Sequence, residues 1–169
     1  MIWTTLTDPL PIIGRMQVVG SAGKIIACAF GDVPQPSGVR RLLAGSDVVE
    51  DATAAAPLAE QLEQYLTGRR RDFDIGLDLR LLSEFQATVL TTLRHEIGYG
   101  HTTSYAALAE AVGRPTAVRA VGRALATNPL CLLLPCHRVI ASSGTLTGYA
   151  GGLSRKAQLL ELEAQQPIS

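Results

Sequence analysis

Residues 128–140 read NPLCLLLPCHRVI, and this stretch decides how the rest of the chain is interpreted. An Asn-Pro pair ends a preceding helical pattern, and an unbroken apolar run then leads to a Pro-Cys-His-Arg corner. The run predicts a buried strand or extended segment that delivers the thiol of Cys136 at its end. A cysteine is a strong nucleophile as a thiolate, and His137 is a candidate base for it. Arg138 can add positive potential that favours the anion.

A Cys-His pair by itself is more often structural than catalytic, and two features downstream of it favour catalysis. Residues 144–152, GTLTGYAGG, predict a glycine-rich hairpin whose aromatic residue, Tyr149, can wall a pocket for a planar ligand. The terminal pattern LSRKAQLLELEA predicts a helix from which Glu163 points inward and Glu161 points to solvent. An inward carboxylate needs a partner, which is either His137, in a Glu-His-Cys relay, or a lysine or arginine. The apolar face predicted for this helix comprises Leu153, Ala157, Leu160 and Ala164.

Helical patterns that precede the thiol predict a helix-turn-helix. Candidate N-caps are Ser83 for LSEFQATVLTTLRHEI, Ser104 for YAALAEAV and Thr116 for AVRAVGRALA. A Gly-Arg-Pro turn at residues 113–115 separates the last two helices. A helical hairpin of this kind can also be part of an ordinary core.

The last of these helices has two different sides. Arg119 and Arg123 project from one side with Ala120 close by, and the other side is apolar. The arginine side otherwise carries only small residues, so a backbone or a groove wall can approach it closely. The alternative is an ordinary amphipathic surface helix. The packing side comprises Val118, Val121 and Leu125.

The chain before residue 79 has a different character. Residues 12–30 predict a β-hairpin around a Ser-Ala-Gly-Lys turn, and residues 32–55 are irregular. Residues 56–68 predict a helix, and FDIGLDL at residues 73–79 predicts a last strand. We therefore expect an α/β (α+β) fold with an N-terminal α/β domain over residues 1–78 and a mostly helical C-terminal domain over residues 79–169.

Composition indicates a globular protein with an aliphatic core, since 47% of the residues are hydrophobic and 18% are charged. The formal net charge is zero, but basic residues are in excess only after residue 78. No acidic residue lies between Glu110 and Glu161, so this stretch predicts a surface suited to a polyanion, or else a solvated basic face. Its basic residues are Arg114, Arg119, Arg123, Arg138, Arg155 and Lys156.

The cysteines and the apolar runs bear on the compartment. Cys28, Cys131 and Cys136 are too few and too irregularly spaced for a disulfide framework, which implies a reducing environment. The N-terminal stretch lacks the pattern of a signal peptide, and no run approaches the roughly 20 apolar residues of a membrane span. We expect a cytoplasmic protein that does not contact a membrane.

The segment NPLCLLLPCHRVI, followed by SSGTLTGYAGGLSRK and LLELE, resembles the methylated-DNA-[protein]-cysteine methyltransferases, also called O6-alkylguanine-DNA alkyltransferases. The similarity runs from about Phe85 to Glu163, and before it the resemblance is weak. It implies a ribonuclease H-like N-terminal domain and a C-terminal domain that binds DNA through a helix-turn-helix. The implied activity is DNA repair by irreversible, stoichiometric transfer of an alkyl group from O6-alkylguanine to Cys136 after base flipping. O4-alkylthymine is a further potential substrate.

The resemblance also assigns roles to the reaction centre. Cys136 matches the alkyl acceptor, His137 the water-mediated base and Glu163 the residue that orients this histidine. Asn128 matches the hinge between the recognition helix and the active-site loop. Arg119 matches the arginine that fills the space of the extruded base.

Further matching residues concern the nucleotide and the DNA. Tyr105 matches the tyrosine that turns the phosphate of the flipped nucleotide and can protonate the leaving guanine. Tyr149 and the backbone around Val139 match the guanine pocket, and Arg123 lies on the DNA side of its helix. Small residues that let this helix lie in the minor groove are Ala117, Ala120 and Gly122.

The implied partner is double-stranded DNA that contains alkylated guanine, bound from the minor groove by a monomer, with cooperative binding left open. No cofactor is implied. Some members of the family hold zinc in the N-terminal domain, but residues 1–78 contain no histidine and only Cys28, so we expect no metal.

Three positions depart from the family pattern, and two other functions compete with repair. Leu90 stands in place of a core tryptophan, Gly98 in place of a loop proline, and Ala150 where a small polar residue or glycine is common. A non-catalytic helix-turn-helix regulator would use the basic helix without chemistry. A cysteine hydrolase would use the Cys-His-Glu set and turn over.

Overall fold

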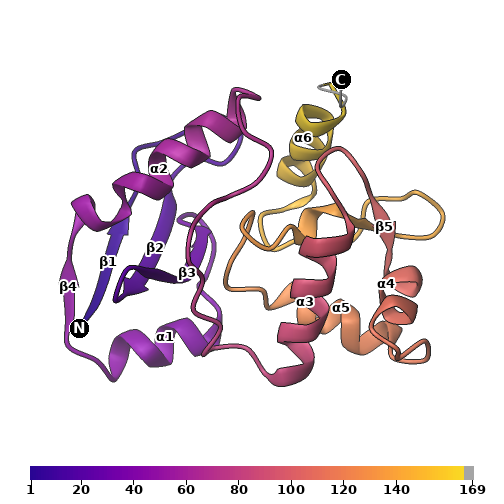
Figure 1. The fold of residues 1–169 in the computed structure, drawn as a ribbon, viewed down its shortest axis with the longest axis horizontal. Helices are drawn as coiled ribbons and strands as arrows, with labels where there is room; N and C mark the ends of the chain where they lie inside the picture. Colours follow the sequence, from indigo (N-terminus) through magenta and orange to yellow (C-terminus); the bar gives the residue numbers. More distant parts are fainter. Residues whose placement is uncertain (166–169) are drawn as a thin grey trace. The chain divides into compact units, whose positions relative to one another are not determined.

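The computed structural model describes residues 1–165 and divides the chain into two compact units (Figure 1). The first comprises Met1–Leu81 and Pro129–Leu133, and the second comprises Leu82–Asn128 and the residues from Leu134 onward. A small sheet with helices is therefore followed by a mostly helical unit, as the sequence predicts. No helix among the described residues is long and apolar enough to cross a membrane.

The first unit is built on a four-stranded sheet with the order β3-β2-β1-β4. β1 and β3 are antiparallel to β2, and β4 is parallel to β1. β2 and β3 form the predicted hairpin, whose turn places Ala22 and Gly23 at positive φ. The strands are β1 (Ile2–Leu6), β2 (Met16–Ser21), β3 (Lys24–Phe30) and β4 (Val48–Glu50).

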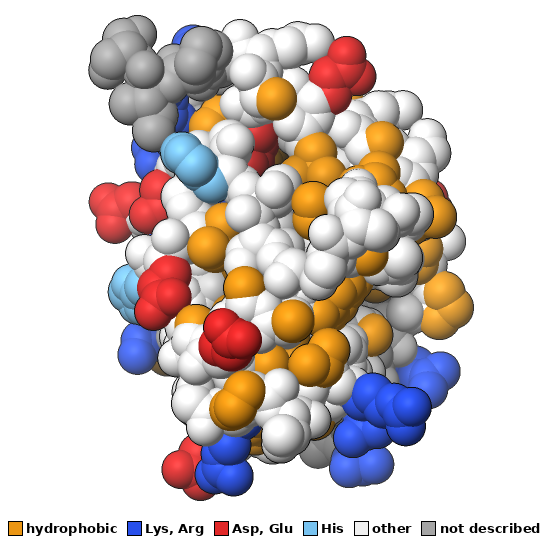
Figure 2. All heavy atoms as spheres, turned by 90° about the vertical axis from the view of Figure 1, so that its right-hand side faces the viewer, with side chains coloured by type: hydrophobic (Ala, Val, Ile, Leu, Met, Phe, Trp, Pro, Cys, Tyr) orange, Lys and Arg blue, Asp and Glu red, His pale blue; other side chains and the backbone are white. Residues whose placement is uncertain are grey.

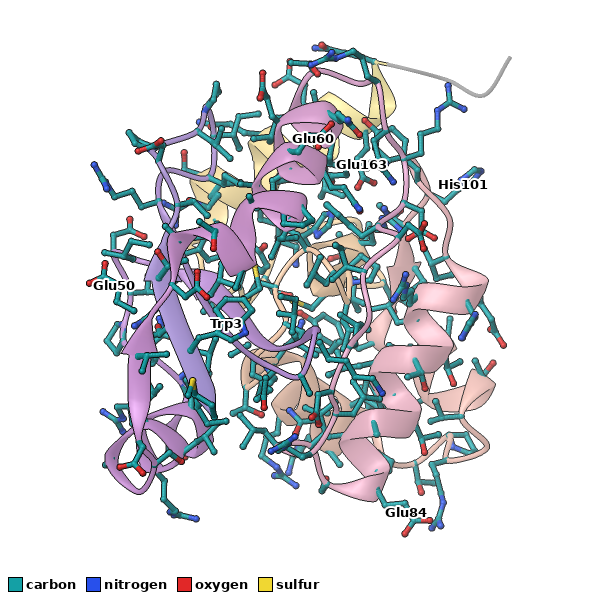
Figure 3. The ribbon with its side chains drawn as sticks, turned by 60° about the vertical axis from the view of Figure 1, so that its left-hand side comes forward. Trp3, Glu50, Glu60, Glu84, His101 and Glu163 are labelled. Atoms are coloured by element: carbon teal, nitrogen blue, oxygen red, sulfur yellow. The ribbon has the colours of Figure 1, made fainter. Side chains whose placement is uncertain are left out.

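Two helices cover opposite faces of this sheet. Val39 of α1 packs in one core cluster with Ile2, whereas Leu58 of α2 and Trp3 line a small cavity. Neighbouring residues of a strand point to opposite faces, so Ile2 and Trp3 mark the two sides. Figure 3 shows Trp3 beside the strands. The helices are α1 (Ser37–Ala44) and α2 (Ala52–Leu66).

The first unit corrects three predictions. The region 32–55 is not irregular, because it contains α1 and β4. Helix α2 begins at Ala52 rather than at residue 56, since the carboxylate of Asp51 accepts hydrogen bonds from two backbone N–H groups of the first turn. The segment 73–79 forms no strand and makes a single bridge, between Leu77 and Ile25.

A segment from the second half of the chain completes the first unit. The N–H of Cys28 donates to the carbonyl of Pro129 at 2.8 Å, and the N–H of Cys131 donates to the carbonyl of Cys28 at 2.8 Å. Pro129–Leu133 joins β3 in this way and therefore belongs to the same compact unit as the sheet.

The second unit consists of short helices whose ends follow the predicted caps with one exception. The side-chain oxygens of Ser83 and Ser104 accept backbone N–H hydrogen bonds at the starts of α3 and α4. Thr116 does not cap α5, which begins after Ala117 without a side-chain cap. The elements are α3 (Glu84–Glu96), β5 (Thr103–Ser104), α4 (Tyr105–Ala111), α5 (Val118–Ala126), the 3-10 helix η1 (Cys136–Arg138), β6 (Val139–Ile140) and α6 (Leu153–Ala164).

Candidate active site

Cys136 begins η1, a single turn of 3-10 helix that leads into β6. The strand predicted before the thiol is absent: residues 130–134 are buried, but their backbone turns, with Leu132 at a φ of 69°. The N–H of Cys136 closes this turn by donating to the carbonyl of Leu134 at 2.8 Å. Cys136 is 5% exposed, so the thiol lies just below the surface.

The amide of Asn128 holds the thiol through hydrogen bonds. Its Nδ2 donates to the carbonyl of Leu134 at 2.9 Å and to the Sγ of Cys136 at 3.2 Å. A donor aimed at sulfur stabilises the thiolate more than the thiol. Only the family resemblance predicts Asn128 in this place, because its position after a helix carries no sign of contact with the cysteine.

Glu163 is the centre of a buried hydrogen-bond network. Its Oε1 lies 2.9 Å from Nε2 of His137, and Arg138 donates to the carboxylate through Nε at 3.0 Å and Nη2 at 3.0 Å. The N–H of Gly100 donates to Oε2 at 3.0 Å. Both partners considered for this carboxylate, a histidine and an arginine, are therefore present. Figure 3 shows Glu163 among other side chains, whereas Glu84 projects outward.

Within this network Glu163 is ionised and His137 is neutral. Burial raises the pKa of Glu163, but the hydrogen bonds from His137 and Arg138 and the positive charge of Arg138 outweigh burial, and this pKa is lowered to about 2. Burial lowers the pKa of His137, and together with the nearby charges of Arg138 and Lys156 it outweighs the opposing hydrogen bond and charge of Glu163. A neutral His137 beside a carboxylate donates through Nε2, which leaves Nδ1 as the basic nitrogen. The ring can therefore accept the proton of a thiol.

Arg138 does not lie where the sequence predicts, which is beside the thiolate. Its guanidinium faces Glu163, and its Nη1 donates to the carbonyl of Ile97 at 2.8 Å. The ring of Tyr99 lies 6.0 Å from the guanidinium carbon. Because Glu163 matches this charge and the side chain is buried, Arg138 does not contribute to the basic surface that the sequence predicts.

The inward side of α6 is not the apolar face that the sequence predicts. It is formed by Lys156, Leu159 and Glu163, whereas Leu153 is 49% exposed. The polar groups on this side are stabilised by hydrogen bonds, so helical periodicity of apolar residues could not identify it. The basic surface predicted from the sequence includes Lys156, which is buried instead. The spacing of Lys156 from Glu163, two helical turns, is the signal that places both on one side of the helix. Ala157 and Ala164 are exposed and Leu160 is half-buried.

Val139 and Tyr149 lie next to the reaction centre. Val139 is buried in β6 and pairs with Thr103 of β5. The ring of Tyr149 meets the ring of His137 edge to face, with centroids 6.4 Å apart. The loop that carries Tyr149 forms a turn at residues 141–145 but no two-stranded hairpin.

The hydroxyl of Tyr105 is bound to the same loop. It donates to the carbonyl of Thr147 at 3.3 Å, and the Oγ1 of Thr147 lies 3.3 Å from it. An added Cβ at Gly122 would lie 4.0 Å from the ring of Tyr105, which is an ordinary contact. Tyr105 therefore lies between α5 and the glycine-rich loop.

Helix α5 presents its arginines to solvent. Arg119 and Arg123 are exposed, whereas Val121 and Leu125 are buried and Val118 is half-buried. Figure 2 views this side of the second unit and shows Lys and Arg side chains along its lower part, beneath apolar side chains. The small residues Ala117, Ala120 and Gly122 are half-buried.

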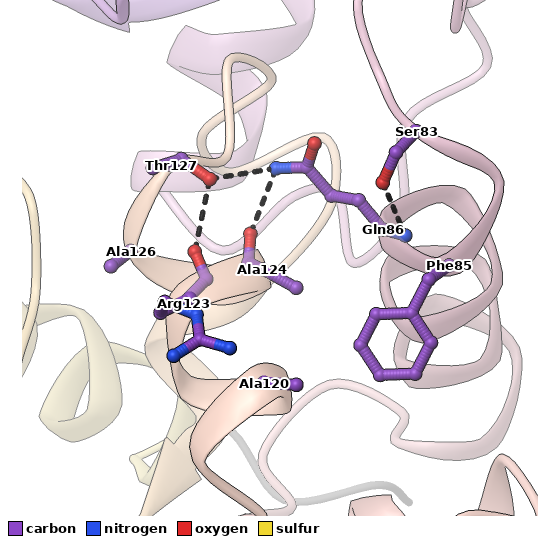
Figure 4. A pocket seen from close by; sticks show the side chains of 8 residues that line it. All are labelled: Ser83, Phe85, Gln86, Ala120, Arg123, Ala124, Ala126 and Thr127. Atoms are coloured by element: carbon purple, nitrogen blue, oxygen red, sulfur yellow. Dashed lines mark hydrogen bonds between the residues drawn. The ribbon is translucent and has the colours of Figure 1, made fainter. Parts of the chain in front are cut away.

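A groove of about 430 Å³ runs between the start of α3 and α5, a feature that sequence analysis did not predict (Figure 4). Gln86 crosses it and donates through Nε2 to the carbonyl of Ala124 and to Oγ1 of Thr127, both at 3.0 Å. These bonds join α3 to the end of α5. Among residues 1–165, no group of three His, Cys, Asp or Glu side chains is placed to hold a metal ion.

Comparison with known proteins places this geometry in a family. A family model described as "6-O-methylguanine DNA methyltransferase, DNA binding domain" matches residues 84–165. A methylated-DNA–protein-cysteine methyltransferase of Mycolicibacterium paratuberculosis is 53% identical over 114 residues, which cover 68% of each chain. The chain belongs to the methylated-DNA–protein-cysteine methyltransferase family. An inducible relative from Bacillus subtilis is 44% identical over 73% of this chain and 68% of its own.

Solved structures of this methyltransferase family extend the similarity to the first unit. The O6-methylguanine methyltransferase of Mycobacterium tuberculosis superposes with a TM-score of 0.85 and 36% identity, covering 100% of this chain and 96% of that one. The same organism's protein in complex with DNA superposes with a TM-score of 0.82 and 35% identity, covering 98% and 93%. The resemblance seen in the second half of the sequence therefore holds for the fold of both halves.

Proposed function

We propose that this protein repairs DNA by direct reversal of damage, as a methylated-DNA-[protein]-cysteine S-methyltransferase that acts once. It transfers an alkyl group from O6 of guanine in DNA to Sγ of Cys136. The observation that carries the proposal is a thiol held by Asn128 next to a neutral His137 that an ionised Glu163 orients. The relatives named methylated-DNA–protein-cysteine methyltransferases support it.

The reaction is a displacement at the alkyl carbon. The thiol proton passes to Nδ1 of His137, directly or through a water molecule, and the resulting thiolate forms the new S–C bond. The O6–C bond breaks, its electron pair remains on guanine, and the guanine accepts a proton, for which Tyr105 is the proposed donor. Tyr105 regains a proton from solvent and His137 releases one to it, so that the net change moves the thiol proton to guanine. The product is a thioether, which His137 and Glu163 cannot hydrolyse. One molecule therefore repairs one lesion.

The DNA surface of the proposed enzyme is α5 with the turn before it. Small side chains allow α5 to approach the minor groove closely, and Arg119 enters the duplex where the base has left. Base flipping costs a few kcal/mol, which an inserted side chain helps to offset. Phosphate contacts, to which Arg123 contributes, would provide most of the affinity without sequence preference.

Access to the thiol requires movement of the glycine-rich loop. Cys136 is 5% exposed, which is too little for a purine to reach the sulfur in the resting protein. We place the flipped guanine between Tyr149 and the backbone at Val139, where residues 148–152, the part of the loop beyond Thr147, would move to admit it. We further propose that the protein is cytoplasmic, because a thiol that must stay reduced requires a reducing compartment. We also propose that it acts as a monomer.

The stoichiometry of transfer tests the proposal. An excess of oligonucleotide containing O6-methylguanine should transfer one methyl group per protein molecule and no more. Cys136→Ser should bind the same oligonucleotide with unchanged affinity and accept nothing. Repeated turnover on an ester would favour a cysteine hydrolase, and DNA binding without transfer by the unmodified protein would favour a regulator.

A further inference from the structure

The chain contains two lysines, and they are in opposite environments. Lys24 is exposed at the start of β3, whereas Lys156 on α6 is fully buried, with 0% exposure. The other basic residues of the chain are arginines. A buried ammonium group is costly unless polar groups compensate it, so Lys156 requires an explanation.

The ammonium of Lys156 joins two backbone carbonyls from different segments. Nζ donates to the carbonyl of Val139 at 2.6 Å and to that of Thr147 at 2.8 Å. Val139 directly follows the turn that carries Cys136, and Thr147 lies in the glycine-rich loop. A compact ammonium can be held between two carbonyls, whereas a planar guanidinium has a wider, fixed geometry.

Thr147 is also the point to which Tyr105 is bound. Its carbonyl accepts a hydrogen bond from the Tyr105 hydroxyl as well as from Lys156. The Tyr105 bond is 3.3 Å and lies near the surface, whereas the Lys156 bond is 2.8 Å and partly buried. If Tyr105 turns toward DNA, Lys156 still holds the loop at Thr147.

The charge of Lys156 also bears on the thiol. Burial lowers the pKa of Lys156, and the neighbouring Cys136 offsets this only in part, because an ammonium and a thiolate attract each other. Glu163 does not take this role, since its carboxylate binds His137 and Arg138. The titratable and charged groups around the thiol turn are Tyr99, Tyr105, His137, Arg138, Tyr149, Lys156 and Glu163.

We propose that Lys156 is a positioning residue for alkyl transfer: its ammonium ties the wall at Val139 to the loop at Thr147 and provides a fixed positive charge beside Cys136. The part of this inference that concerns the pocket rests on the proposed function. The part that concerns the charge near the thiol is independent of the proposed function. Lys156 cannot contact DNA from its buried position, so its effect must be on the reaction rather than on DNA affinity.

The test compares Lys156→Met with Lys156→Arg, which keeps the charge, and with Lys24→Met as the matched surface control. We expect Lys156→Met to slow single-turnover methyl transfer at least about tenfold while affinity for undamaged DNA stays within about twofold. Lys156→Arg should retain more activity, and Lys24→Met should match the unmodified protein. If Lys156→Met transferred the methyl group as fast as the unmodified protein, the proposed role of Lys156 in holding the pocket would be overturned.

A second readout uses iodoacetamide and needs no DNA. Removing the ammonium should move the pH midpoint of Cys136 alkylation upward, by about one unit, because the thiolate loses a cation. Peptide mass spectrometry assigns the modification to Cys136. An unchanged midpoint would overturn the electrostatic role. If the unmodified protein accepts no methyl group, the proposed function fails while this measurement still decides the role of Lys156.

A third readout covers the case in which Lys156→Met does not fold. Acetic anhydride should acetylate Lys24 of the unmodified protein while Lys156 remains unmodified, both free and with undamaged DNA. Equal acetylation of the two lysines would show that Lys156 does not hold the loop, and would overturn the proposal.

Discussion

The reaction centre and the outer side of α5 use charge in opposite ways. At the centre, Glu163 is 1% exposed and is bound by His137, Arg138 and a backbone N–H group. On α5, Arg119 and Arg123 extend into solvent. Buried charged groups depend on fixed partners, whereas exposed charges act over a distance and are screened by salt.

This difference separates chemistry from binding. Orientation of His137 and stabilisation of a thiolate require atoms that do not move, and the network around Glu163 provides them. Recognition of any DNA sequence requires contacts that tolerate variation, and we propose that the exposed arginines of α5 provide those. Changes at the centre should therefore affect the reaction rate and stability, and changes on α5 should affect either DNA affinity or the step in which the base leaves the duplex.

The largest effect should follow Glu163→Gln. The change removes the charge that orients His137 and leaves Arg138 buried without its partner, so we expect transfer to slow by about 100-fold or more. Loss of one partner of a buried pair should also lower the free energy of unfolding by about 3–5 kcal/mol. Single-turnover kinetics and urea unfolding measure the two effects. Glu161→Gln, exposed on the same helix, is the control, and an equal effect of both variants would contradict the comparison.

A smaller effect should appear when the protein is acidified. The pKa of Glu163 is lowered from 4.5 to about 2, so its ionised form stabilises the fold above pH 4.5. That contribution, about 3 kcal/mol, should be lost as the pH falls from about 4.5 toward 2. Unfolding by urea at several pH values measures the loss. In Glu163→Gln this part of the pH dependence should be absent, and its persistence would assign it to other carboxylates.

The smallest effects should come from the two arginines of α5, which form a matched pair. Arg119→Ala should slow transfer by about tenfold with little change in affinity for undamaged DNA, because the arginine acts after the base has left. Arg123→Ala should instead weaken DNA binding a few-fold and reduce the slope of log affinity against log salt by about one. Single-turnover kinetics measure the transfer rate of each variant, and fluorescence anisotropy at several salt concentrations measures its affinity for DNA. Identical profiles would mean that both arginines only contact phosphates.

The elements that sequence patterns predict well are those with local signals. Ser83 and Ser104 cap their helices, and the β2–β3 hairpin forms around its predicted turn. Glu163 is buried as predicted, although the inward side of α6 is not the apolar face from which this was inferred. The caps and the hairpin depend on neighbours within a few residues, so the sequence contains the information directly.

The features that sequence patterns miss depend on distant partners. Val39, Leu42 and Leu43 of α1 have helical spacing, but over only eight residues and in a stretch otherwise rich in Pro, Gly and Asp, and residues 73–79 lack a continuous neighbouring strand. Lys156 is buried because carbonyls of Val139 and Thr147 receive it. No local pattern shows such partners, and the role of Asn128 follows only from the family resemblance.

Peptide mass spectrometry of the acceptor tests the central claim most directly. The protein is incubated with a duplex that contains one O6-methylguanine and digested, and fragment ions of the cysteine-containing peptides locate the added methyl group. Our account predicts that Cys136 gains one methyl group while the buried Cys28 and Cys131 do not change. A methyl group on another residue, or an unmodified Cys136 beside repaired DNA, would contradict it.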